Sequence, residues 1–266
     1  MALNQLTKND PKKVLGIDIG GTSIKAAPVD VAGGKLLAEA MRVATPQPAT
    51  PKAVVNVIQD ILQHFQWQGA IGCGFPGVVK NGITLSAANV AKEWVGYHFR
   101  KKLQALTSGV VGIINDADAA GLAEMRFGAG KPYNRHSGGV VMIITLGTGI
   151  GSAMFVDSHL VPNTELGHLK MNNMDAEKQA ATVIREQEGL TWEVWGGRVN
   201  RYLQMLEKLF SPDVFIIGGG VSESSEKFFP FIDVTATLLA AQMGNDAGIV
   251  GAALAVEQGG SGIVKQ

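Results

Sequence analysis

Two stretches of the chain repeat one pattern of apolar and glycine-rich positions. Residues 14–30 read VLGIDIGGTSIKAAPVD, and residues 140–157 read VVMIITLGTGIGSAMFVD. Each stretch has an apolar β-branched run, a glycine-rich turn with a threonine, and a second apolar run. This pattern predicts a β-hairpin in both places.

The turns of these two hairpins have the chemistry of phosphate-binding loops. Glycines lack a Cβ atom and permit positive φ, so a phosphate oxygen can meet backbone N–H groups directly. A threonine adds a hydroxyl to each turn, and an aspartate before the first turn suits a divalent cation bound beside phosphate. The residues are Asp18, Gly20, Gly21, Thr22, Gly147, Thr148, Gly149 and Gly151. Ordinary tight hairpins are the alternative for either turn alone, but the repetition favours two phosphate-binding hairpins that face each other across a cleft.

Hydrophobic periodicity predicts the other main elements. Strands have alternating apolar and polar residues or a continuous apolar run, whereas helices have apolar residues every three or four positions. The expected strands are 36–45, 70–79, 109–116 and one from 214, and the expected helices are 51–65, one after 116, 179–210 and one ending near 259.

Asp116 follows the strand GVVGIIND and precedes an alanine-rich helix. In open α/β sheets, ligand groups gather where strands end, and a helix N-terminus favours an ionised carboxylate. A helix N-cap is the equally good structural explanation for Asp116.

A polar loop at 162–177 holds Glu165, His168 and Glu177, and a third glycine cluster occupies 218–220. The loop suits a polyhydroxylated ligand better than a metal, because no cysteine accompanies the histidine. A solvated surface loop remains the alternative. The glycine cluster suits a base or ribose, and a plain strand-to-helix turn explains it equally well.

Composition narrows the classes of protein to which this chain can belong. The 266 residues carry 23 basic and 23 acidic side chains and one cysteine, Cys73. Zero net charge argues against general nucleic-acid or membrane-surface binding, and one cysteine excludes a disulfide framework. We expect a cytoplasmic protein with a flexible lead-in at 1–11.

Several basic residues could line a track for a long anion, or could be ordinary solvated surface residues. They are Lys12, Lys13, Arg100, Lys101, Lys102, Lys131 and Arg135.

Taken together, the chain resembles the sugar-kinase branch of the ROK family (repressor, open reading frame, kinase) in the actin/hexokinase superfamily. The motifs that carry the resemblance span nearly the whole chain: IDIGGTSIKAA at 17–27, GFPGVV at 74–79, NVAKEW at 89–94, NDADAAGLAE at 115–124, LGTGIGSAMF at 146–155, ELGH at 165–168 and IIGGGVS at 216–222. It implies an α/β, duplicated ribonuclease H-like, two-domain fold. We place the domains at 12–116 with 247–266, and at 117–246.

The resemblance also implies roles for individual residues. Sugar contacts are expected from Asn89, Asn115, Asp116, Glu165, His168 and Glu177. The phosphate loops are expected to comprise Asp18, Gly20, Gly21 and Thr22, then Thr148, Gly149 and Gly151, with Gly219 and Gly220 near the nucleoside of ATP. Many ROK kinases follow the ExGH motif with zinc-binding cysteines; this chain has none there and looks like the polyphosphate-dependent glucokinases, so we expect no zinc site.

The implied reaction is phosphoryl transfer from polyphosphate, ATP or both to the 6-hydroxyl of glucose, with mannose as a second candidate acceptor. Asp116 is the expected general base, and Asp18 is expected to hold Mg²⁺ through water. A strictly ATP-dependent hexose or N-acetylhexosamine kinase is the alternative, and a non-catalytic ROK sugar sensor or repressor is a weaker one. The sequence leaves the oligomeric state, including a homodimer, open.

Overall fold

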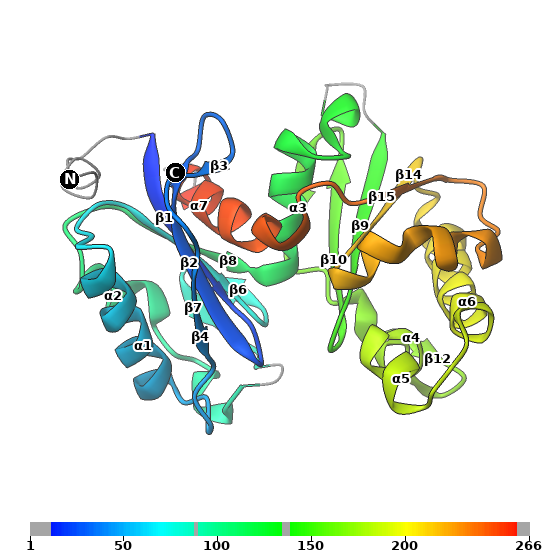
Figure 1. Ribbon diagram of the computed structural model, residues 1–266, viewed down its shortest axis with the longest axis horizontal. Helices are drawn as coiled ribbons and strands as arrows, with labels where there is room; N and C mark the ends of the chain where they lie inside the picture. The colour runs from blue at the N-terminus through cyan, green and yellow to red at the C-terminus, as the bar shows by residue number, and fades with distance from the viewer. Residues whose placement is uncertain (1–11, 88–89, 135–138, 260–266) are drawn as a thin grey trace, which may run out of the picture. The chain divides into compact units, whose positions relative to one another are not determined.

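The computed structural model describes residues 12–87, 90–134 and 139–259, which form two compact units (Figure 1). The first unit takes the described residues up to Ala123 and from Asp246 onward; the second is Glu124–Asn245. The domain bounds expected from the sequence stay a prediction, and the expected lead-in at 1–11 lies outside the described residues. Within the described ranges, no helix has the length and apolar character needed to cross a membrane.

The first unit is built on a six-stranded mixed sheet with the strand order β3-β2-β1-β5-β8, and β4 pairs with β2. Its strands are β1 (Lys13–Ile19), β2 (Ser23–Asp30), β3 (Lys35–Leu36), β4 (Met41–Ala44), β5 (Ile71–Phe75) and β8 (Val111–Asn115). β1 and β2 form the first predicted hairpin, antiparallel, whereas β1, β5 and β8 are parallel. A small hairpin joins β6 (Val79–Lys80) to β7 (Ile83–Thr84), and the 3₁₀ turn η2 (Lys92–Trp94) follows.

Helices cover both faces of this sheet (Figure 1). They are α1 (Pro51–His64) and α2 (Phe99–Gln104) on one face, and α7 (Ala247–Gly259) on the other. Leu15 and Ile17 of β1 join Ile58 and Ile61 of α1 in one buried core, because alternate residues of a strand point to the same face. Thr50 caps α1 by accepting a hydrogen bond from the Ala53 N–H.

A row of glycines lets α7 lie directly on the sheet. Gly16, Gly72 and Gly112 are neighbours in the register of β1, β5 and β8. A Cβ atom at these positions would come within 2.1, 1.8 and 2.5 Å of backbone atoms of α7. Any side chain there would therefore push the helix off the sheet.

The expected strand at 36–45 is wrong in one respect, because the structure divides it into β3 and β4. Both pair with β2, at Val29↔Leu36 and then at Ala26↔Met41. The segment between these pairs is longer than the part of β2 opposite it, so the ladder cannot run through without a break.

The second unit has a five-stranded sheet with the order β11-β10-β9-β14-β15. Its strands are β9 (Val140–Leu146), β10 (Ile150–Val156), β11 (His159–Val161), β14 (Val214–Gly218) and β15 (Thr237–Ala240). β9 and β10 form the second predicted hairpin, and β9, β14 and β15 are parallel. This sheet has the same order of two antiparallel pairs followed by parallel strands as the first, so the sequence repeat extends to the topology.

Helices and short 3₁₀ turns complete the second unit. They are η3 (Lys131–Tyr133), η4 (Leu166–His168), α4 (Glu177–Ala180), α5 (Thr182–Gln187), α6 (Trp192–Phe210), η5 (Gly220–Lys227), η6 (Phe229–Phe231) and, at the boundary, η7 (Gly244–Asp246). A two-stranded hairpin joins β12 (Lys170–Met171) to β13 (Met174–Asp175). The helix expected over 179–210 is thus three helices, because Ala181 is extended and Gly189 has positive φ.

The chain passes from the first unit to the second within α3 (Asp116–Phe127) and returns after Asn245. Within the second unit, the buried Glu124 carboxylate links the segment where the chain enters this unit to the segment where it leaves. It accepts hydrogen bonds from the N–H groups of Gln242 at 3.0 Å, Met243 at 2.7 Å and Ala129 at 2.9 Å. One acidic side chain therefore ties the end of α3 to the segment before α7.

Candidate active site

Hydrogen bonds to its backbone carbonyl groups hold the first hairpin turn, between β1 and β2. Thr45 donates its hydroxyl to the Gly20 carbonyl at 2.6 Å and its N–H to the Thr22 carbonyl at 3.0 Å, and Gln47 reaches the Gly21 carbonyl at 3.5 Å. The Thr22 side chain is exposed at the tip. With its carbonyls engaged on one side, the turn can offer N–H groups and a hydroxyl to an anion.

The second turn, between β9 and β10, is held in the same manner. The Gly147 carbonyl accepts from the Val183 N–H at 3.1 Å, and the Leu146 carbonyl accepts from the Thr182 hydroxyl at 3.1 Å. Thr148 is exposed at its tip. The start of α5 thus supports this turn as Thr45 supports the first one.

The glycines of these two turns do not use the positive φ that they permit. Positive-φ glycines occur elsewhere, at positions such as Gly77 and Gly219, and not at the five glycines of the two hairpins. Close approach explains Gly149 instead, since a Cβ there would lie 2.6 Å from the Glu177 Oε2. A side chain at this position would displace the Glu177 carboxylate.

Two acids converge at the carboxyl ends of the parallel strands in the first unit. Asp18 pairs with Gly74 in the register of β1 and β5, and Asp116 follows the last residue of β8. A Cβ on Gly74 would lie 3.8 Å from the Asp18 Oδ1 and 3.6 Å from the Asp116 Cα. The glycine of the GFPG motif therefore stands between the expected metal ligand and the expected base.

Asn115 is the N-cap of α3, and the Asp116 Oδ1 also accepts a hydrogen bond from the Ala117 N–H, at 2.9 Å. The Asn115 Oδ1 accepts from the N–H groups of Ala117 at 2.9 Å and Asp118 at 3.0 Å, and its Nδ2 donates to the Gly77 carbonyl at 3.2 Å. Asp116 is the first residue of the helix, with a partly exposed side chain. The N-cap position therefore belongs to Asn115 and not to Asp116. The base role of Asp116 stays a prediction.

Asp18 has the surroundings of a cation ligand. Burial raises the pKa of Asp18, and Lys25, its partner in the β1–β2 register, opposes this rise. The N-terminal turn of α7 packs on the carboxylate, since a Cβ on Gly248 would lie 2.6 Å from the Asp18 Cγ. A desolvated carboxylate beside a phosphate-type turn fits a divalent cation such as Mg²⁺, which would favour the ionised form.

The polar groups of the ELGH motif gather in the second unit. Gly167 packs so closely on β10 that a Cβ would lie 2.3 Å from the Ile150 carbonyl oxygen, and Ser152 accepts from the Leu166 N–H at 3.0 Å. This contact holds η4, which Glu165 precedes and His168 ends. The His168 Nε2 lies 4.0 Å from the Glu165 Oε2.

Three acidic groups surround His168. Its Nδ1 lies 3.5 Å from the Asp175 Oδ2 and 3.7 Å from the Glu177 Oε1. Burial raises the pKa of Glu165; His168 opposes that rise and Glu177 adds to it. The structure thus brings together the three expected sugar-binding residues of this unit, with Asp175 as a fourth that sequence analysis missed. The asparagine pair at 172–173, which marks a tight turn, was the available signal.

His168, Asp175 and Glu177 lie close enough together to contact one metal ion. Zinc sites of structural type use thiolates and imidazoles, whereas this group has two carboxylates. The Lys170 ammonium already forms an ion pair with Asp175. A cation in that position would face this ammonium, so the residues do not fit the zinc site of related kinases.

The third glycine cluster adjoins the second hairpin. β14 pairs in parallel with β9 up to Gly218↔Thr145. Gly219 has a φ of 85°, and a Cβ there would lie 2.2 Å from the Leu146 carbonyl oxygen. Gly219 and Gly220, which are expected near the nucleoside, therefore follow β14, the neighbour of the strand β9 that leads into the turn with Thr148.

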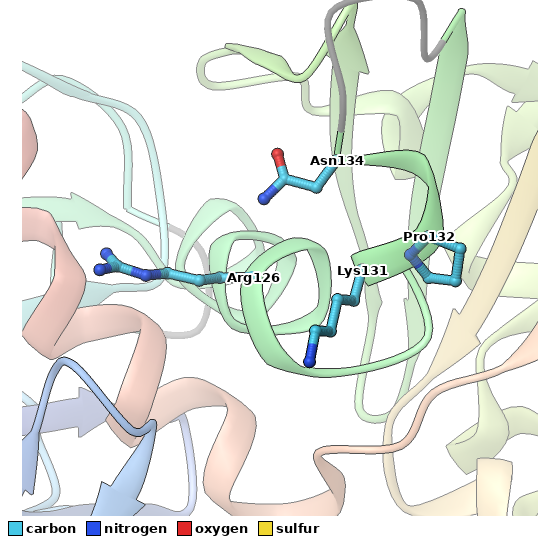
Figure 2. Close-up of a pocket in the computed structure, with 4 residues that line it drawn as sticks. All are labelled: Arg126, Lys131, Pro132 and Asn134. Atoms are coloured by element: carbon cyan, nitrogen blue, oxygen red, sulfur yellow. The ribbon is translucent and has the colours of Figure 1, made fainter.

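A basic pocket of about 520 Å³ occupies another part of the second unit. Its lining residues are Arg126, Lys131, Pro132 and Asn134 (Figure 2). Pockets of this size hold small molecules, and two cations with an amide suit anionic groups. Sequence analysis singled out Lys131 but missed Arg126, which the alanine-rich pattern of α3 conceals. Arg135 and the expected sugar ligand Asn89 lie outside the described residues.

The repeated sheets and their glycine hairpins define the actin/hexokinase-like fold. The sequence profile of the ROK family matches residues 14–183, and the chain belongs to that family. It is 44% identical over 241 residues to the polyphosphate glucokinase of Mycobacterium tuberculosis strain CDC 1551 / Oshkosh, covering 90% of this chain and 89% of the relative.

Solved structures agree with this assignment. The inorganic polyphosphate/ATP-glucomannokinase from Arthrobacter sp. strain KM matches with a TM-score of 0.84 and 42% identity, covering 92% of this chain and 98% of the other. A ROK family glucokinase from Streptomyces griseus, in complex with glucose and AMPPNP, matches with a TM-score of 0.78 and 26% identity over 92% and 99% of the two chains.

Proposed function

We propose that this protein is a glucokinase that transfers a phosphoryl group from polyphosphate or ATP to the 6-hydroxyl of glucose. The observation that carries the proposal is the similarity of nearly the whole chain to a polyphosphate glucokinase and a polyphosphate/ATP-glucomannokinase, at 44% and 42% identity. The two glycine hairpins support it, as do Asp18 and Asp116 in the first unit and Glu165 and Glu177 in the second. Mannose as a second acceptor and a cytoplasmic location stay predictions.

Asp116 acts as the general base for the hexose hydroxyl in this proposal. An ordinary Asp has a pKa of about 3.9, and an alcohol is similar to water at about 15.7. Complete prior deprotonation would cost roughly 16 kcal/mol at about 1.36 kcal/mol per unit. That cost equals the whole barrier of an enzyme that turns over about 10 times per second. The proton therefore moves to Asp116 late, as the new O–P bond forms.

Most of the acceleration then comes from positioning and charge. The Gly20–Thr22 and Gly147–Gly149 turns offer N–H groups and hydroxyls to donor phosphates, and Glu165, His168 and Glu177 orient the sugar hydroxyls. Asp18 would hold Mg²⁺, which balances the charge of the donor phosphates when bound. A homodimer stays a prediction.

The test is product formation. Purified protein is incubated with glucose and Mg²⁺ and with either ATP or polyphosphate freed of nucleotide, and glucose 6-phosphate is measured. We expect product with both donors. Product with ATP alone would make the chain a strictly ATP-dependent kinase, and no product with either donor would refute the proposal.

A further inference from the structure

We propose that Asp175 is a positioning residue that holds the His168 imidazole through its Nδ1, so that the Nε2 is the nitrogen presented to the hexose. The sugar-facing part of this inference rests on the proposed function. The contact between Asp175 and His168 does not, and it can be tested without sugar. The 3.5 Å separation of the His168 Nδ1 and the Asp175 Oδ2 carries the inference.

The β12–β13 hairpin places Asp175 beside His168. Lys170 pairs with Asp175 and Met171 with Met174, so the loop consists of Asn172 and Asn173 alone. Both asparagines have positive φ, 51° and 65°, as a type I′ turn requires. The tight turn returns the chain to His168 within a few residues.

Contacts outside its turn hold this hairpin firmly. Met171 is buried in the second unit's core, and its carbonyl accepts a hydrogen bond from the buried Gln179 amide. The Ala176 N–H donates to the Leu169 carbonyl at 2.8 Å. Asp175 therefore sits on a fixed support, which a residue needs if it is to orient another side chain.

The Asp175 carboxylate is divided between two partners. Its Oδ1 pairs with the Lys170 ammonium, and its Oδ2 faces His168. Lys170 and His168 lower the pKa of Asp175, which keeps it ionised and able to accept a proton-bearing nitrogen. The Asp175 side chain is 18% exposed and that of His168 is 51% exposed. The more buried carboxylate therefore supports the more exposed imidazole.

A neutral imidazole has one N–H, and a neighbouring carboxylate decides which nitrogen carries it. With Asp175 at the Nδ1, the proton resides there and the Nε2 becomes an acceptor for a sugar hydroxyl. Glu177 also approaches the Nδ1, at 3.7 Å, but its other oxygen packs against Gly149. Asp175 uses its Oδ1 for Lys170 and keeps its Oδ2 at the shorter distance from the Nδ1, so this hairpin can orient the histidine without a metal ion.

The experiment records ¹⁵N spectra of labelled full-length protein without sugar, with the His168 signals assigned from His168→Gln. Wild type is expected to have the Nδ1–H form of His168, and Asp175→Asn, which removes the charge but keeps the side chain's size, is expected to shift His168 toward the Nε2–H form. Asp175→Glu restores the carboxylate and should recover the wild-type spectrum in part. Asp157→Asn, at an exposed turn residue with positive φ, is the matched control and should leave the spectrum unchanged.

Kinetics supply the second readout. Losses of supporting groups of this kind are on the order of 10–100-fold, so Asp175→Asn should raise the glucose KM by about tenfold or more while the donor KM stays unchanged. Thermal unfolding shows whether each variant is folded. An unchanged His168 spectrum in a folded Asp175→Asn protein would overturn the inference, and so would an altered spectrum with an unchanged glucose KM. If wild type makes no glucose 6-phosphate, the proposed function fails, while the sugar-free spectra still decide whether Asp175 orients His168.

Discussion

Gly248→Ala should greatly lower the activity of the enzyme without unfolding it. Gly248 is in the first turn of α7, and an added Cβ would lie 2.6 Å from the Cγ and Oδ2 of Asp18. An ordinary contact begins near 3.4 Å, so one partner must move by roughly 0.8 Å or more. In most helices the same change is favourable, by about 1 kcal/mol.

The helix cannot supply this movement. Gly16 and Gly72 let the backbone of α7 touch the sheet, and on another side Gly251 packs so closely on Ala119 that a Cβ would lie 1.6 Å from its carbonyl oxygen. The Asp18 carboxylate must therefore rotate away from its place beside the first hairpin turn. A misplacement of about 1 Å costs on the order of 10²-fold in rate.

The assay compares kcat/KM for glucose phosphorylation and the unfolding temperature of wild type, Gly248→Ala and Gly197→Ala. Gly197 is in α6 with no atom within 4 Å of its Cβ position, so this control should keep full activity. We expect about a 10²-fold loss for Gly248→Ala with a cooperative unfolding transition. A folded Gly248→Ala protein with wild-type activity would refute the role of Asp18 in catalysis.

Four further changes test other parts of the site. Asp116→Asn should lower kcat by about 10²–10⁴-fold and leave glucose binding, measured by calorimetry, intact; unchanged kcat would exclude Asp116 as the base. Thr148→Ala should raise the KM of the donor, and a rise in the glucose KM alone would contradict its assignment. Glu124→Gln removes a charged acceptor from several buried N–H groups, so urea unfolding should show a loss of about 1.5–3 kcal/mol; equal stability would contradict its role as a link. Lys131→Gln should raise the KM for long polyphosphate severalfold more than that for ATP, and an equal change for both would separate the basic pocket from polyphosphate use.

Both hairpins and the parallel strands that follow them were predictable because their apolar runs are continuous and their turns are rich in glycine. The reason for the glycines was not predictable in full. Gly149 and Gly248 each leave room for a carboxylate that is distant in sequence, Glu177 and Asp18. A pattern along the chain cannot register a contact that exists only after folding.

The surroundings of His168 illustrate the same limit. The ELGH motif marked Glu165 and His168, whereas Asp175 looked like one of several polar loop residues. Its proximity depends on a two-residue turn at Asn172 and Asn173, which are both left-handed. Asparagine tolerates that conformation, but the sequence alone does not state that both residues adopt it.

The glycine row under α7 has a consequence for how the protein is made. The ribosome delivers β1, β5 and β8 well before the helix that covers them, because α7 is formed by residues 247–259. Until α7 emerges, one face of the nascent first sheet lacks its natural cover and offers bare backbone where Gly16, Gly72 and Gly112 lie side by side. The first unit can therefore complete its fold only after α7 has been made, and chains cut short before α7 should be the ones that chaperones and proteases capture.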